Sequence, residues 1–236
     1  MAANNFVIGN KTKIYFTVMP DSLLDTPVAP TDVTITTSAA ATSGATSLAV
    51  TALSGPVPAG TAVVLTSGSG GSAVKTTVYI TEHAKTGDTS LAVEATSGAI
   101  ASGATGQYKA LLMLQGGTTS DENIEANDQQ VTVYGDELGF ATGIVTGASW
   151  SISYSFNVLP SDLGYFRLAY AAQNAVKGIR GWVRKEDPAP AGYTSGEIIE
   201  GLCDVTGFSK SNPADGIITG QCTFTGRGTP TLKHYV

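Results

Sequence analysis

The chain has 236 residues, of which 42% are hydrophobic and 14% charged, and its formal net charge is −6. Ordinary soluble domains carry roughly 25% charged residues, so either a threonine- and serine-rich surface faces solvent or other copies of the chain cover much of it. The acidic balance argues against a duplex-binding surface, which needs a basic stripe. We expect no signal peptide and no membrane insertion, since no apolar run approaches the ~18 residues of a membrane span.

Residues 1–32 combine an N-terminal strand with a proline-rich linker. The strand lies between Phe6 and Met19, with Ile14, Phe16 and Val18 on one face. Three prolines then keep the chain extended, because proline cannot continue a helix.

An internal repeat occupies residues 33–107, where charged residues are rare. The phrase from Gly44 to Gly60 returns 43 positions later, from Gly87 to Gly103, and each copy carries one short alternating strand. The glycines place turns at equivalent points, and a Ser/Gly run at 67–71 separates the strands of a hairpin. Two copies are too few for a solenoid, so we expect a small pseudo-symmetric β-domain inserted into a main fold that resumes at residues 108–236.

An acidic segment follows a short apolar strand at Ala110–Leu114. It runs from Asp121 to Glu137 and contains one strand candidate, Gln130–Tyr134, but no basic residue. Its acids are Asp121, Glu122, Glu125, Asp128, Asp136 and Glu137. The pattern of a calcium loop is missing, which favours a solvated or partner-facing loop.

The clearest pattern is the segment 150–158, in which large apolar residues alternate with small polar ones. Because successive side chains of a strand point to opposite faces, one face is apolar and the other polar and neutral. The apolar residues are Trp150, Ile152, Tyr154, Phe156 and Val158, and the polar ones are Ser151, Ser153, Ser155 and Asn157. Ser161 or Asp162 can then cap a helix. Apolar residues at helical spacing from Leu163 to Val176 predict that this helix packs on a sheet and ends before Gly178.

The charge changes sign within this helix. Between positions 167 and 185 there is no acid, and the bases are Arg167, Lys177, Arg180, Arg184 and Lys185. Further strands are predicted at 179–184, around Trp182, and at 198–208 and 217–225. A strong turn signal at Ser211–Gly216 joins the last two strands.

No catalytic, metal or cofactor site is assembled by these residues. His83 and His234 are the only histidines, and both stand in polar settings typical of solvated side chains. The pattern Gly68–Ala73 fits a dinucleotide fingerprint only nominally, because it leads into a strand instead of a helix. Cys203 and Cys222 are too few for a disulfide scaffold, and we expect reduced, buried thiols in a protein folded in a reducing cytoplasm. The sequence therefore predicts no enzyme and no cofactor.

The order of features from Val131 onward resembles the tail tube (major tail) proteins of long-tailed bacteriophages. The resemblance lies in the phrases Val131–Gly139 and Ser151–Asp162, the alanine-rich helix, the strand around Trp182, and the closing stretch Val205–Thr231 with P-x-D-G at its turn. It covers most of residues 108–236 together with the N-terminal strand. The insert departs from the minimal family, and its repeated phrases resemble β-modules attached to various phage structural proteins.

The resemblance implies a mainly β fold, a two-sheet β-sandwich with one α-helix. It also implies a structural virion protein, the subunit of a phage tail tube that stacks as hexameric rings into a hollow conduit for DNA ejection. Tape-measure, baseplate or tail-tip, and tail-terminator proteins are the implied partners, and the implied location is the virion tail after assembly in the host cytoplasm. The alternative is a surface- or carbohydrate-binding β-module, such as an adhesin or capsid decoration protein. Clustered exposed aromatics, typical of such modules, are not evident.

Three expectations follow for a tube subunit. A neutral or acidic lining suits DNA passage, so Ser151, Ser153, Ser155 and Asn157 are candidates to line the channel. The two charged segments either neutralise each other in one fold, or are solvated, or meet between copies in a head-to-tail contact. We take the last as our hypothesis, with Asp121, Glu122, Glu125, Asp128, Arg167, Lys177, Arg180, Arg184 and Lys185 as interface candidates. The insert is expected to stand outside the tube wall and to be dispensable.

Overall fold

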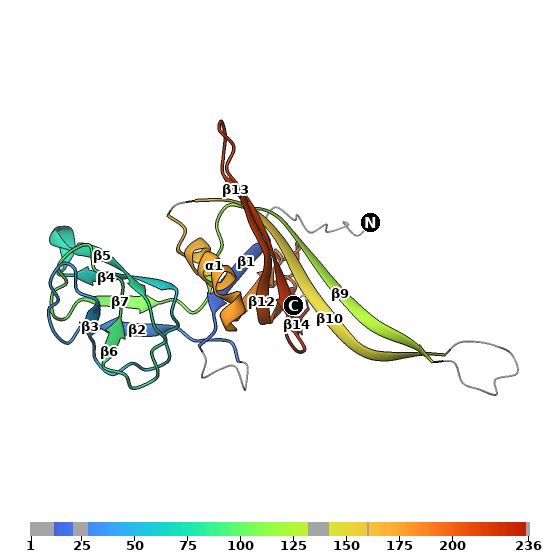
Figure 1. Ribbon diagram of the computed structural model, residues 1–236, viewed down its shortest axis with the longest axis horizontal. Helices are drawn as coiled ribbons and strands as arrows, with labels where there is room; N and C mark the ends of the chain where they lie inside the picture. The colour runs from blue at the N-terminus through green and yellow to red at the C-terminus, as the bar shows by residue number, and fades with distance from the viewer. Residues whose placement is uncertain (1–11, 21–27, 132–141, 160, 235–236) are drawn as a thin grey trace, which may run out of the picture.

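The computed structural model describes residues 12–20, 28–131, 142–159 and 161–234, and for residues 127–131 and 142–146 it describes the backbone alone. The described chain is mainly β with one α-helix, which confirms the predicted fold class. Figure 1 shows a small β-module at one end of the long axis, a central sheet with the helix beside it, and a long hairpin at the other end.

The central sheet is antiparallel and has eight strands. They are β1 (Lys13–Val18), β8 (Leu112–Met113), β9 (Gly117–Val131), β10 (Thr142–Asn157), β11 (Gly181–Glu186), β12 (Ile198–Ser211), β13 (Thr219–Gly226) and β14 (Thr231–Lys233). The hydrogen-bonded order is β8-β1-β11-β12-β13-β10-β9, and β14 pairs with β12. We call this sheet, together with the helix, the core.

The sheet curves strongly around one apolar interior. Strands β1 and β13 would lie about 14 Å apart in a flat sheet at ~4.8 Å per strand. The rings of Phe16 and Phe224, on these two strands, nevertheless have centroids only 5.4 Å apart. The chain also passes from β8, at one edge, to β9, at the other, through three residues, Leu114–Gly116. The core is therefore one continuous hydrogen-bonded sheet that curves back on itself.

The alternating segment on β10 confirms the predicted strand. Trp150, Ile152, Tyr154 and Phe156 are all buried in the core. The Trp150 ring lies over Gly201 and Gly226, where a side chain would collide with it, and its Nε1 donates a hydrogen bond of 2.8 Å to the carbonyl of Gly228. The strand begins at Thr142, eight residues earlier than the alternation predicts, because the sequence of residues 142–149 carries no period-2 apolar signal.

Helix α1 (Leu163–Gln173) starts at Asp162, one of the two predicted caps. Its Oδ1 accepts from the Gly164 amide at 2.8 Å, and its Oδ2 accepts from the Gln115 amide at 2.8 Å. Burial raises the pKa of Asp162 despite these hydrogen bonds. A short 3-10 turn, Ala175–Lys177, follows the helix, and Gly178 ends it in the left-handed region. Val176, predicted on the apolar face, is fully exposed because the α-helix ends before it.

The inserted segment forms its own β-structure with its own apolar core. Its elements are β2 (Val33–Thr36), β3 (Ser47–Ala49), β4 (Thr61–Ser67), the 3-10 turn η3 (Gly70–Ser72), β5 (Val74–Ile80), β6 (Ser90–Ala92) and β7 (Thr105–Tyr108). They form a four-stranded sheet, β2-β7-β4-β5, and a two-stranded one, β3-β6. We call residues 33–108 the module. Val33 pairs with Tyr108, so the chain enters and leaves the module at one place.

The two sequence repeats are related by a pseudo-two-fold axis. Equivalent residues Leu48 and Leu91 are cross-strand partners at the centre of the β3-β6 pair. Backbone hydrogen bonds also occur in pairs shifted by 43 residues: Val50 to Thr89 corresponds to Val93 to Thr46, and Gly60 to Ile80 corresponds to Gly103 to Thr37. Each repeat therefore completes the hydrogen bonding of the other.

Other predicted strands differ in extent. The segment Ala110–Leu114 has only the two-residue strand β8, because its apolar side chains are divided among three clusters: Ala110 in the module core, Leu111 beside Trp182, and Leu114 in the central core. Strand β14 was not predicted. The candidate strand Gln130–Tyr134 coincides with the end of β9 at its first two residues, and the remainder lies outside the described residues, as do Asp136 and Glu137.

Candidate assembly surfaces and the polar face of the sheet

The small polar residues of β10 lie on the face of the sheet opposite the apolar interior. Cross-strand pairing places Ser153 beside Thr223 of β13 on one side and Asp121 of β9 on the other, and Ser155 beside Gln221 and Thr119. Ser151 and Asn157 continue the row. Strands β9, β10 and β13 contain no lysine or arginine. The result is a band of hydroxyl and amide groups with a carboxylate at one side.

The hairpin of β9 and β10 extends away from the body as a two-stranded ribbon (Figure 1). Backbone pairing continues from Gly117 to Val131, but the side chains of 121–126 and 147–149 are exposed on both faces. Ile124 is 50% exposed, and β9 has no strand partner on its outer side among the described strands. No described part of the chain covers these side chains, and a two-stranded ribbon without a covering layer is only marginally stable in water.

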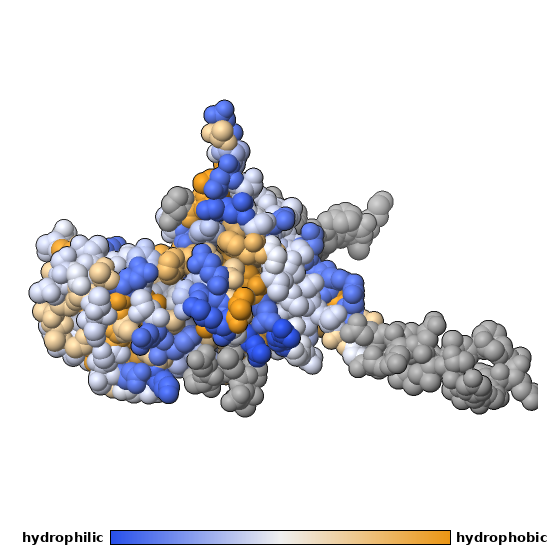
Figure 2. Space-filling model, in the orientation of Figure 1, coloured by the Kyte–Doolittle hydropathy of each residue, from blue (hydrophilic) through white to orange (hydrophobic). Residues whose placement is uncertain are grey.

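A second hairpin, between β12 and β13, projects in a different direction (Figure 1). Side chains 209–219 are exposed, including Ile217 and Ile218. The Ile218 carbonyl accepts from the Val158 amide at 2.8 Å, which ties the hairpin to the end of β10 near exposed Leu159. Figure 2 shows a narrow, mainly hydrophilic column with hydrophobic atoms at its base. This projection is therefore a second candidate contact surface.

Two predicted interface arginines have carboxylates of their own chain beside them. The Arg180 Nε lies 3.7 Å from Asp204, which also binds Arg227. The Arg184 Nε lies 3.9 Å from the buried carboxylate of Glu200. Arg184 lies on β11 and Arg180 directly before it, and Asp204 and Glu200 lie on β12, so β12 supplies local counter-charges to the basic segment.

Lys185 and Glu122 bind each other within one chain. The Lys185 Nζ lies 2.9 Å from Glu122 and 2.8 Å from Asp187, and Asp187 also accepts from the Thr12 hydroxyl at 2.7 Å. Burial disfavours the charged amine, but its hydrogen bonds to the two carboxylates outweigh this and raise the pKa of Lys185. Strands β9 and β11 are four positions apart in the sheet, so this ion pair spans its concave side. For this pair, neutralisation within one fold is what the structure shows.

Arg167 was wrongly predicted to lie at a subunit interface. Its side chain has no exposed surface and binds the carbonyl of Lys109 at 2.7 Å. Sequence reasoning missed this because a lone arginine on an exposed-looking helix face is normally solvated. Among the remaining candidates, Asp121, Glu125 and Lys177 are exposed, and the side chain of Asp128 lies outside the described region. An intermolecular role for these four stays a prediction.

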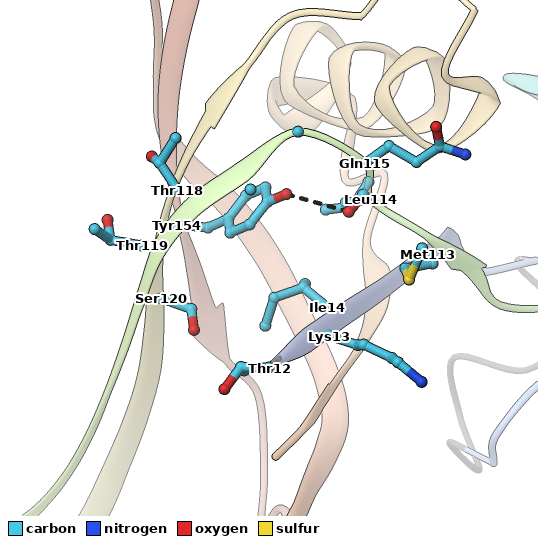
Figure 3. A pocket seen from close by; sticks show the side chains of 12 residues that line it. Thr12, Lys13, Ile14, Met113, Leu114, Gln115, Thr118, Thr119, Ser120 and Tyr154 are labelled. Atoms are coloured by element: carbon cyan, nitrogen blue, oxygen red, sulfur yellow. Dashed lines mark hydrogen bonds between the residues drawn. The ribbon is translucent and has the colours of Figure 1, made fainter. Parts of the chain in front are cut away.

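A cavity of about 530 Å³ lies between β1 and the start of β9 (Figure 3). Ile14, Leu114 and Tyr154 are its buried lining residues, and the Tyr154 hydroxyl donates to the Leu114 carbonyl at 3.4 Å. Lys13 is its charged lining residue, and its side chain points away from the space between the strands (Figure 3). The lining offers strand-edge backbone and hydroxyl groups but pairs no acid with a base, so it suits a polypeptide contact better than catalysis.

Both cysteines are free and buried. Burial raises the pKa of both thiols, that of Cys222 to about 12. Cys203 lies opposite Gly226, so the two thiols are not direct cross-strand neighbours. Within the described ranges, no group of three or more His, Cys, Asp or Glu residues could hold a metal ion. No helix in those ranges is long and apolar enough to span a membrane.

Comparison with known proteins finds distant structural neighbours. The sequence matches no protein-family model and no curated protein. The fold is similar to a chain in the tail of an empty gene transfer agent particle with C6 symmetry, at 15% identity and a TM-score of 0.41, over 52% of this chain and 86% of that one. It is also similar to a chain of the native gene transfer agent virion, at 15% identity and a TM-score of 0.42, over 52% and 88%.

Proposed function

We propose that this protein is a structural virion protein, the repeating subunit of a phage tail tube. The observation that carries the proposal is the β9–β10 ribbon, whose described side chains from 121 to 126 are exposed on both faces. Because such a ribbon is marginal by itself, a neighbouring surface must complete it. A subunit that is incomplete alone is suited to a repeating assembly, and the sequence resemblance to tail tube proteins indicates stacked, hexameric rings.

The polar face of β10 suits the wall of a DNA conduit. DNA that met fixed lysines or arginines would release counterions, bind and stall. Ser151, Ser153, Ser155 and Asn157 offer neutral groups instead, with threonines and a glutamine on β13 and Asp121 on β9 beside them. We assign these four residues to the channel lining, past which DNA moves without specific binding.

Contacts between copies use complementary, non-identical surfaces. In a head-to-tail ring one patch of each copy meets a different patch of the next. The exposed acids Asp121 and Glu125 on the ribbon supply one patch, and exposed Lys177 belongs to the other. Arg180 and Arg184 contribute less, because Asp204 and Glu200 of the same chain already neutralise them. Complementary charge sets the register of such a contact more than its affinity, so affinity also requires buried apolar area. Exposed Ile124 supplies such area on the ribbon.

A tube subunit contacts the partners that the family resemblance implies. These are a tape-measure protein in the lumen, and baseplate or tail-tip and tail-terminator proteins at the ends of the tube. The protein then functions in the virion tail after assembly in the host cytoplasm. The surface-binding alternative is less favoured, because among the described aromatic side chains only Tyr193 is exposed. A carbohydrate platform normally needs several exposed rings.

Electron microscopy of the purified protein tests the proposal. We expect rings or tubes of uniform diameter from the wild type and dispersed monomers from Ile124→Asp, because a carboxylate would be desolvated at the ribbon contact. The control is Val64→Asp, which changes an exposed apolar residue on the module. Circular dichroism would establish that both variants fold. Wild-type protein that stays monomeric at high concentration, or normal tubes from Ile124→Asp, would contradict the proposal.

A further inference from the structure

Helix α1 is buried on two sides by two different bodies. Leu168 and Ala171 point into the core. On the other side, the Phe166 ring lies 4.8 Å from the ring of Tyr79 on the module, at an angle of 56°. The Tyr170 ring lies directly on Gly60, so that any side chain at position 60 would collide with it. The helix is therefore held between core and module (Figure 1).

A buried arginine closes this contact. One terminal nitrogen of Arg167 donates to the carbonyls of Lys109 and Ala110, at 2.7 and 3.3 Å, and to the hydroxyl of Thr17 at 3.1 Å. Its guanidinium also lies 4.9 Å from the centre of the Tyr108 ring. Burying a charged side chain costs free energy unless hydrogen-bond acceptors or an aromatic ring surround it, as they do here. The site thus exists only when α1, β1 and the end of the module are all in place.

The pseudo-symmetry of the module allows the surface that contacts α1 to be compared with its equivalent in the other repeat. Shifting by 43 residues relates Tyr79 to Thr36 and Tyr108 to Leu65, so the two aromatic residues that meet the helix occur in only one repeat. Gly60 corresponds to Gly103, which has nearly the same backbone conformation, with φ of 77° against 71°. Nothing lies within 4 Å of the position where a Gly103 side chain would begin. The module thus has two surfaces with equivalent backbones, and only one of them carries the aromatic residues that contact α1.

We propose that Gly60, Tyr79 and Tyr108 form a docking site specific for α1, and that the docked module holds this helix on the core sheet. The module is then a fixed and necessary part of the subunit and not a tethered appendage. Its two ends are adjacent, so replacing residues 33–107 by a linker is geometrically simple. Such a chain would nonetheless expose Phe166 and Tyr170, which is why we replace the expectation that the insert is dispensable.

The two equivalent glycines provide a matched test in the full-length chain. Alanine at either position suffers the same strain from a positive φ, but only Gly60→Ala also pushes against Tyr170. We expect amide exchange in α1 to be faster in Gly60→Ala than in Gly103→Ala by about tenfold or more. Equal exchange rates in the two variants would overturn the proposal.

A second variant covers the case that Gly60→Ala does not fold. Tyr79→Thr installs the residue that the other repeat carries at the equivalent position, and it leaves the backbone unstrained. We expect faster exchange in α1, while exchange in the β3-β6 pair, which makes no ring contact with Phe166, stays unchanged. Exchange in α1 that remains at the wild-type rate would refute the docking role of Tyr79.

Discussion

Replacing Lys185 with methionine tests whether the ion pair across the concave side of the sheet stabilises the fold. Methionine keeps the unbranched apolar stem, one atom shorter, and removes the charge that binds Glu122 and Asp187 at 2.9 and 2.8 Å. The two carboxylates would then face each other near an apolar interior. The matched control is Arg184→Met on the same strand, where the partner lies 3.9 Å away.

The expected loss of stability in Lys185→Met follows from how deeply the ion pair is buried. Removing one member of a fully buried ion pair costs about 3–5 kcal/mol, whereas an exposed pair is worth about 0–1 kcal/mol. The Lys185 side chain is 10% exposed and Glu122 is 34% exposed, so solvent screens the pair in part. We therefore expect Lys185→Met to lower the free energy of unfolding by about 2 kcal/mol, and Arg184→Met by less than about 1 kcal/mol.

The pH dependence gives an independent check. The folded state raises the pKa of Lys185, so its contribution is fully present below the ordinary lysine pKa and is lost as pH rises through the raised value. Urea unfolding of the monomer, followed by tryptophan fluorescence, should show a constant difference between wild type and Lys185→Met from pH 6 to 9 and a smaller one at strongly alkaline pH. Equal effects of the two methionine substitutions at pH 7 would refute the argument.

Two further predictions concern the thiols and the channel. Because burial raises the pKa of Cys203 and Cys222, alkylation of the native protein should be slow and become fast on denaturation, and mass analysis showing a Cys203–Cys222 disulfide would contradict this. Ser155→Lys places a cation in each copy beside Gln221 and Thr119, so tubes should form but DNA ejection should slow at low salt and recover as salt rises. Ser155→Asn is the neutral control, and ejection at the wild-type rate from Ser155→Lys particles at low salt would remove Ser155 from the lining.

Elements whose signal is local were predictable from the sequence. The strand through Trp150, the start of α1 at Asp162, and the turns of the repeat depend on side-chain periodicity, a capping carboxylate and glycines within a few residues. The candidate channel face was predictable for the same reason, since the residues between buried ones on a strand must point the other way. The first half of β10 was not predictable, because residues 142–149 carry no period-2 apolar pattern.

Pairing between distant segments was decided only by the tertiary structure. The sequence established a mainly β chain with one helix, a duplicated insert and two segments of opposite charge. It could not establish that Lys185 meets Glu122 across a curved sheet, or that Arg167 lies beneath the module. The charge or apolarity of a side chain indicates which kind of partner it needs, but not which distant strand provides that partner. The curvature of the sheet and the docking of the module supply the partners, because they place residues more than 50 positions apart within hydrogen-bonding distance.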